Sequence, residues 1–128
     1  MENSRLIYIR LHGFQDQPYL YGDPGFPTAL TARQVREMEL PGSLVFLEGC
    51  YGYQFGRAFV DAGARAVVGC DRPTWGRRWR MGPSSVVGRE WLRQIRQGRH
   101  YTRALEAALV KVPPVYRRGW AAINRRSI

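Results

Sequence analysis

The sequence predicts an α/β fold with three layers, in which helices cover both faces of a small, mostly parallel sheet. The run "SLVFLEG" from Ser43 is continuously apolar over the length of one strand, as expected inside a parallel sheet covered on both faces. A further buried strand is expected in "ARAVVGC", from Ala64 to Cys70. Because these strands alternate with helical patterns along the chain, parallel strands joined by right-handed crossovers are favoured.

The first strand is expected in "RLIYIRL", from Arg5 to Leu11, because this stretch is rich in β-branched and aromatic residues and ends at His12 and Gly13. The segment from Phe14 to Leu30 contains three prolines and two aspartates, a composition typical of a loop. Any extended piece around Tyr19 to Tyr21 should therefore be short and peripheral.

Two helices are expected before and after the buried strand that starts at Ser43. The first should open with a capping box, Thr31 with Gln34 three residues later, and run through about Met38. The second should follow Cys50, where apolar residues recur at helical spacing and a glycine closes the run: Phe55, Ala58, Phe59, Ala62 and Gly63.

Two further helices are expected in the second half of the chain. One should start near Ser84 or Ser85 and close at Gly98, with its apolar face made by Val87, Trp91, Leu92 and Ile95. The next should open at Thr102 and end at Pro113, with its inward positions at Leu105, Ala108, Leu109 and Val112. We assign residues 1–114 to one α/β domain and residues 115–128 to a basic C-terminal tail, in which Trp120 and Ile123 are the candidate docking residues.

The composition is that of one folded domain. A chain of 128 residues has room for a single core, and 45% hydrophobic residues with 12% aromatic residues argue against disorder. No apolar run approaches the ~18 residues that a membrane helix needs. The start, "MENSRLIYIR", lacks the hydrophobic region of a secretory signal. We therefore expect a cytoplasmic protein with reduced thiols and no membrane association.

The charge is strongly basic, with 20 lysine and arginine residues against 10 acidic residues and a net charge of +10. Lys111 is the sole lysine, so the excess is almost entirely arginine. One interpretation is a surface for nucleic acid or an acidic partner, with "GRRWR" (Gly76 to Arg80) and "NRRS" (Asn124 to Ser127) as its densest points. The stretch "TWGRRWR" from Thr74 is the candidate for binding acidic ligands. The other interpretation is solvated helix faces, which we favour because no nucleic-acid fold motif accompanies the charge.

The candidate chemistry lies where the strands end. Function in open parallel sheets sits beyond the carboxyl ends of the strands, and His12 follows the first strand while Cys50 follows the next. Neighbouring strands lie ~4.8 Å apart, so if these two are adjacent, an imidazole and a thiol come close together as base and nucleophile. A helix that begins just after Cys50 would favour its thiolate through the positive end of the helix dipole.

The ordered features are carried by "YIRLHG" followed by "LTARQVREMELPGSLVFLEGCYGYQFGRAFVDAGARAVVG". A strand ends in His-Gly, a hydrophobic strand delivers a cysteine, the next helix carries a Phe ahead of an "aGa" turn, and a strand with "VVG" follows. This order resembles the caspase-like cysteine peptidases, most of all their bacterial CHAT branch. The resemblance covers about Leu6 to Ala108 and includes "RALEAAL", which is similar to the closing helix of that branch.

The resemblance implies a cysteine endopeptidase that acts on a protein or peptide. It implies that His12 is the general base or acid, that Cys50 is the nucleophile, and that the backbone amides of Gly13 and Cys50 bind the oxyanion. Members of the family usually carry strands and helices before the His-Gly strand, so the resemblance also implies a fold truncated at the N-terminus. We expect another copy of the chain or a partner to pair with the edge of the first strand, because a bare hydrophobic edge invites association.

Glu48 and Tyr51 are the candidate substrate-binding residues. Side chains alternate along a strand, so Glu48 and Cys50 should point the same way. In several caspase-like branches, the residue two before the nucleophile is an acid that lines the pocket for the residue before the cut. By that resemblance Glu48 would favour arginine or lysine, with asparagine as a second choice. The alternative is that Glu48 pairs with one of the chain's own arginines.

Three functions remain open. A cysteine endopeptidase that cleaves after a basic residue is favoured, the second is a catalytically inactive caspase-like interaction module completed by self-association or a partner, and the third is a basic nucleic-acid-binding protein. Two other roles are considered for Cys70. It would be a metal ligand together with His12, Cys50 and Asp71, or it would form a disulfide with Cys50. We expect neither a metal nor a cofactor, because no Cys-x-x-Cys or His pair at ligand spacing is present.

Overall fold

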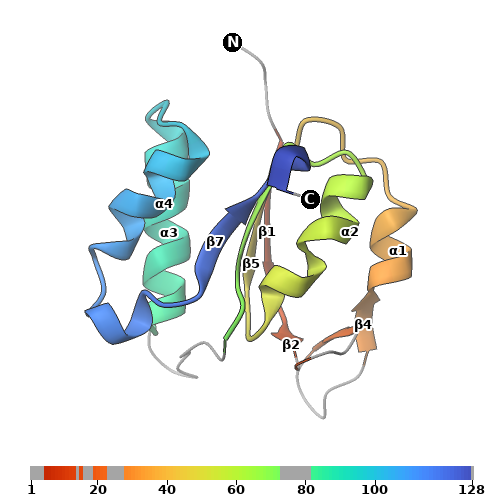
Figure 1. Cartoon of the computed structure of the whole chain (residues 1–128), viewed down its shortest axis with the longest axis horizontal. Coiled ribbons are helices and arrows are strands. Elements are labelled where there is room, and N and C mark those ends of the chain that lie inside the picture. The colour runs from red at the N-terminus through yellow and green to blue at the C-terminus, as the bar shows by residue number, and fades with distance from the viewer. Residues whose placement is uncertain (1–4, 14, 16–18, 23–27, 73–81, 128) are drawn as a thin grey trace.

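A four-stranded sheet with the strand order β1-β5-β6-β7 runs through the centre of the fold (Figure 1). Its strands are β1 (Leu6–Arg10), β5 (Leu44–Glu48), β6 (Ala66–Cys70) and β7 (Trp120–Ile123). The first three are parallel and β7 is antiparallel to β6, so the expected α/β class with a mostly parallel sheet is confirmed. The structure is a computed structural model that describes residues 5–13, 15, 19–22, 28–72 and 82–127.

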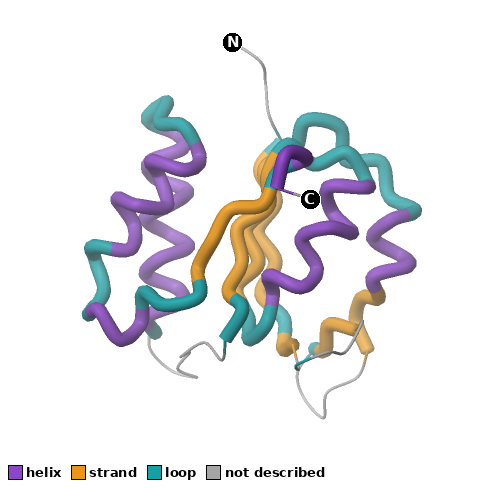
Figure 2. Tube along the Cα trace, viewed as in Figure 1, coloured by secondary structure: helices purple, strands orange, loops and turns teal. Residues whose placement is uncertain are grey.

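Helices lie on both sides of this sheet, as Figures 1 and 2 show. On one side are α2 (Gly56–Asp61) and, beyond it, α1 (Ala32–Arg36). On the other side are α3 (Pro83–Arg96) and α4 (Tyr101–Leu109). The central strand β5 sends alternate side chains to each side, since Val45 and Leu47 belong to the core under α2 while Leu44 and Phe46 pack with Trp91 of α3. This double coverage explains why β5 is apolar at consecutive positions.

A small antiparallel sheet adjoins the carboxyl end of β1. It consists of β2 (His12–Gly13), β3 (Tyr19–Tyr21) and β4 (Thr28–Thr31). The short strand expected around Tyr19 is confirmed, whereas β4 begins inside the segment that was expected to be a loop. The capping box of α1 is also confirmed, because the Gln34 amide donates to Thr31 Oγ1 at 3.1 Å and the Thr31 amide donates to Gln34 Oε1 at 2.9 Å.

The segment after Cys50 differs from the expectation. An α-helix does not begin directly after the cysteine; the chain first forms a 3₁₀ turn, η1 (Gly52–Phe55), and α2 starts only at Gly56. The expectation that the dipole of an α-helix starting just after Cys50 favours its thiolate is therefore wrong. The end of α2 is as expected, because Gly63 takes the left-handed conformation with φ +107° that a glycine adopts without strain.

The two C-terminal helices lie where the apolar periodicity placed them. The Nδ1 atom of His100 accepts a hydrogen bond from the Thr102 amide at 3.3 Å, so His100, and not Thr102, caps α4. Beyond the helix, η2 (Pro114–Tyr116) leads into β7, and η3 (Arg125–Ser127) follows. The segment assigned to a tail from residue 115 thus supplies the fourth strand of the sheet, and its Ile123 is only 5% exposed.

No helix in the part of the chain that the structure describes is long and apolar enough to cross a membrane.

Candidate active site

The two candidate catalytic residues follow neighbouring strands. β1 pairs directly with β5 in parallel, with Arg10 opposite Glu48, and the Leu11 amide donates to the Glu48 carbonyl at 3.2 Å. Two residues after Arg10 comes His12, at the start of β2, and two residues after Glu48 comes Cys50, in the turn that follows β5. The condition that the sequence left open, adjacency of these two strands, is therefore met, and both segments lie at the carboxyl edge of the sheet, the lower edge in Figure 1.

Two glycines allow the backbone segments to approach at this edge. A Cβ added to Gly13 would overlap the carbonyl oxygen of Cys50, and a Cβ added to Gly49 would overlap that of Leu11. Both obstacles are backbone atoms, which cannot rotate away as a flexible side chain can. Any other residue at Gly13 would therefore push the His12–Gly13 segment away from the cysteine.

The turn that carries Cys50 is held in an unusual backbone conformation. Tyr51 has φ 57°, in the left-handed region, and it is the only non-glycine residue with positive φ among the residues that the structure describes. This conformation costs about 1–2 kcal/mol for a residue with a side chain. The Tyr51 amide donates to the Arg72 carbonyl at 3.2 Å, which ties the turn to the chain after β6. Such strain persists where surrounding structure imposes it, and it is common at functional sites.

The second cysteine lies in a different environment. Cys70 is only 1% exposed, its Sγ donates to the Arg118 carbonyl at 3.5 Å, and burial raises the pKa of its thiol. A buried thiol with a raised pKa is a poor nucleophile, whereas Cys50 is half-buried. The two cysteines do not form a disulfide, and no three histidine, cysteine or acidic residues of the described ranges cluster closely enough to hold a metal ion.

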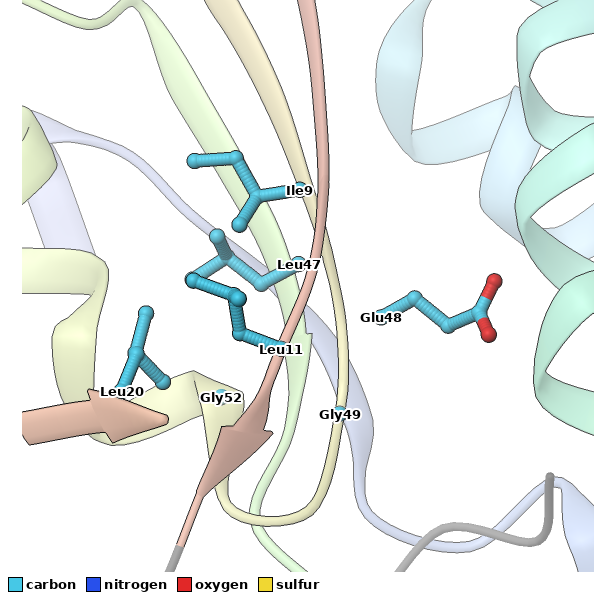
Figure 3. Close-up of a pocket in the computed structure, with 7 residues that line it drawn as sticks. All are labelled: Ile9, Leu11, Leu20, Leu47, Glu48, Gly49 and Gly52. Atoms are coloured by element: carbon cyan, nitrogen blue, oxygen red, sulfur yellow. The ribbon is translucent and has the colours of Figure 1, made fainter. Parts of the chain in front are cut away.

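The carboxylate of Glu48 is buried and hydrogen-bonded. Its side chain is 4% exposed, and Figure 3 shows it pointing toward α3, away from Leu47. The hydroxyl of Tyr8 donates to Oε1, the hydroxyl of Ser85 donates to Oε2 at 2.9 Å, and Arg10 Nε lies 3.0 Å from Oε2. The alternative left open by the sequence, an ion pair with one of the chain's own arginines, is the arrangement in the structure.

Tyr8 is a half-buried donor of this cluster. Burial, followed by its hydrogen bond to the Glu48 carboxylate, raises the pKa of the Tyr8 phenol above its ordinary value. The ring stacks on Phe46 with the centroids 5.2 Å apart. Tyr8 therefore remains a neutral donor through the physiological pH range and helps to fix the carboxylate.

A small apolar hollow lies on the opposite face of the strands, beside the turn that carries Cys50 (Figure 3). Its lining consists of Ile9, Leu11, Leu20, Leu47, Glu48, Gly49 and Gly52. The empty volume of about 160 Å³ includes space open to solvent, so this is a shallow hollow and not an enclosed pocket.

Sequence reasoning did not identify Tyr8, Arg10 and Ser85 as partners of Glu48. The available signal was the alternation in "RLIYIR", where Tyr8 and Arg10 share one face of the strand. The register that sets Arg10 opposite Glu48 cannot be read from the sequence. The stretch "TWGRRWR", expected to attract acidic ligands, lies outside the described residues.

Comparison with models of known protein families finds no match to this chain. Comparison with curated protein sequences finds no match either.

Proposed function

We propose that the protein is a cysteine endopeptidase with a caspase-like, three-layer α/β/α fold, in which Cys50 is the nucleophile and His12 the general base and acid. One observation carries this proposal: the parallel register of β1 and β5 leads directly to His12 and Cys50 on adjacent segments of one sheet edge. The close approach of Gly13 to the Cys50 carbonyl supports it because it holds the two segments together, and the strained turn at Tyr51 supports it because such strain is common at functional sites.

In the proposed reaction, His12 accepts the proton of the Cys50 thiol as the sulfur attacks the carbonyl carbon of the scissile peptide bond. The developing oxyanion accepts hydrogen bonds from the backbone amides of Gly13 and Cys50. His12 then gives the proton to the leaving amine, and a thioester joins the substrate acyl group to Cys50. Water hydrolyses this thioester, which releases the carboxylic acid and restores the thiol.

The first test concerns the reactivity of Cys50. At pH 7, iodoacetamide should modify Cys50 faster than it modifies glutathione, and His12→Ala should slow the reaction at Cys50. Peptide mapping assigns the modified residue. Modification of Cys50 at the rate of glutathione or below, unchanged by His12→Ala, would contradict an activated nucleophile.

The second test is hydrolysis of a mixed fluorogenic peptide library. Cys50→Ala and His12→Ala should each abolish cleavage while circular dichroism shows an intact fold. Cys70→Ala is the control variant, because Cys70 lies in the core and takes no part in the proposed reaction. Loss of cleavage in Cys70→Ala together with retention in Cys50→Ala would show that the wrong thiol has been chosen.

The exposed edge of β1 favours a second candidate function, an interaction module. In the described part of the chain β1 pairs with β5 on one side only, so its other edge has no strand partner there. The second edge of this strand, with the sequence "LIYIR", can accept a strand from a second copy or a partner. Light scattering over a range of concentrations tests self-association. A monomer at every concentration, with the β1 amides protected from hydrogen exchange, would rule it out.

A further inference from the structure

A row of arginines lies at the amino edge of the central sheet, opposite the edge that carries the candidate active site. Arg5 directly precedes β1, Arg65 directly precedes β6, and Arg125 comes two residues after the end of the antiparallel strand β7. The Leu44 amide donates to the Arg5 carbonyl at 2.8 Å, and the Arg65 amide donates to the Ser43 carbonyl at 2.7 Å. These bonds align the first two backbones along the upper edge of the sheet in Figure 1, where β7 also ends.

Three more arginines extend this row. Arg96 is the last residue of α3, and Arg99 follows it in the connection to α4, which lies at the same end of the fold in Figure 1. Asn124 joins this connection to β7, because its Nδ2 donates to the Tyr101 hydroxyl at 2.8 Å while its Oδ1 accepts the Arg126 amide at 2.9 Å. We call six exposed residues the amino-edge arginines: Arg5, Arg65, Arg96, Arg99, Arg125 and Arg126.

The ion pairs of the described residues engage other arginines. On α3, for example, Glu90 pairs with Arg93, and pairs of this kind along one helix are typical of solvated helix faces. The amino-edge arginines lie instead at the ends of strands and helices. No ion pair between described residues includes five of them: Arg5, Arg96, Arg99, Arg125 and Arg126. The amino edge therefore carries positive charge that the described acidic residues do not neutralise.

This arrangement fits a ligand with a row of phosphates. A guanidinium matches the geometry of a phosphate and binds it in a bidentate manner. Three strand spacings of ~4.8 Å separate β1 from β7, so Arg5 and Arg125 lie about 14 Å apart along the edge, a length over which a nucleic-acid duplex presents about eight phosphate charges. A protein that binds a membrane surface also inserts apolar side chains. The exposed large hydrophobic residues of the described part, Met38, Val110 and Val115, lie outside this row.

We propose that the amino-edge arginines bind the sugar-phosphate backbone of a nucleic-acid duplex without reading its sequence. Tyr101, the aromatic residue beside the row, is only 8% exposed and offers no free ring on which an unpaired base could stack, which favours a duplex over a single strand. Contacts to phosphates alone carry no sequence information. This function is separate from the proposed peptidase activity, because His12 and Cys50 belong to the opposite edge of the sheet.

The test measures binding of the full chain to a fluorescein-labelled duplex by fluorescence anisotropy over a range of salt concentrations. The double variant Arg125→Gln, Arg126→Gln should weaken binding at least about tenfold at low salt. It should also lower the slope of log K against log salt by about two, because each phosphate contact contributes about 0.9. The matched control, Arg33→Gln with Arg57→Gln, removes the same charge from exposed arginines of α1 and α2 and should leave the slope nearly unchanged.

A second pair of substitutions, Arg96→Gln with Arg99→Gln, should have the same effect and preserves the test if the first variant folds poorly by circular dichroism. A duplex of unrelated sequence should compete equally, and the tighter of a DNA and an RNA duplex identifies the source of the phosphates. Equal losses in the edge and control variants would mean that net charge alone drives binding and would overturn the proposal. It would also be overturned by equal competition from a poly-glutamate peptide, or by binding to phosphatidylserine vesicles without binding to either duplex.

Discussion

Replacing Gly88 with alanine should destabilise the protein, although this exchange stabilises most helices. Gly88 lies inside α3, where alanine is worth about 1 kcal/mol more than glycine in helix propensity. An alanine Cβ, however, would lie 2.7 Å from Cε2 and 2.8 Å from Cζ of Tyr8 and would overlap the Tyr8 hydroxyl. Carbon atoms in proteins do not approach this closely, so either the ring or the helix must move.

Both movements are opposed by the packing around Tyr8 and α3. The Tyr8 ring is stacked on Phe46 with centroids 5.2 Å apart, and its hydroxyl is bonded to Glu48. α3 is held in place by Trp91, which is fully buried. Overpacking a filled core costs about 1–3 kcal/mol, and contacts this short fall in the upper part of that range. After the gain in helix propensity, the free energy of unfolding should fall by about 1–2 kcal/mol.

Urea denaturation followed by circular dichroism measures this change, and a second background isolates its cause. Tyr8→Leu removes the hydroxyl, Cζ and Cε2, so Gly88→Ala in that background should raise the stability by about 1 kcal/mol through helix propensity. The expected signature is a reversal of sign between the two backgrounds. Stabilisation in the wild-type background, or equal destabilisation in both, would refute the reasoning.

Three further changes test other parts of the structure by the same denaturation assay. Glu48→Gln should lower stability by about 1.5–3 kcal/mol, because hydrogen bonds to a charged group are lost; unchanged stability with a changed preference among peptides would instead support a pocket role. Hydrogen bonds from Arg93, then from Gln94, lower the pKa of Glu90 to about 2 from 4.5. The stabilisation from Glu90 is therefore complete above about pH 4.5 and is lost toward pH 2, so Glu90→Gln should differ from wild type at pH 7 and match it at pH 2. Deleting residues 115–128 should abolish cooperative unfolding, because β7 is part of the sheet; a deletion variant that still unfolds cooperatively would restore the boundary at residue 114.

The elements with strong local signals were predictable from the sequence. β5 and β6 are apolar over one strand length, Thr31 and Gln34 form the expected capping box, and Gly63 ends α2 as expected. Each of these features depends on residues close together in the chain. The order and type of the central elements followed from such signals.

The features that were missed depend on distant parts of the chain. β7 contains Trp120, two alanines and Ile123, a pattern with little strand signal, and its place follows from pairing with β6. The 3₁₀ turn after Cys50 ends at Phe55 and buries that residue, as a helix would, so the apolar pattern did not distinguish the two. The candidate site was predictable as far as the strand ends of His12 and Cys50, whereas the partners of Glu48 depend on a register that the sequence does not specify.

The Glu48 cluster connects that register to the candidate site. Tyr8 and Arg10 are two residues apart, so both face Glu48 only while β1 keeps its present alignment with β5. A slip of one residue would turn both side chains to the opposite face, because side chains alternate along a strand. It would leave the buried carboxylate without them, at a cost of about 3–5 kcal/mol. The same alignment sets the level at which the segments carrying His12 and Cys50 leave β1 and β5, so the ion pair of the buried Glu48 with Arg10 also fixes the register on which the proposed base and nucleophile depend.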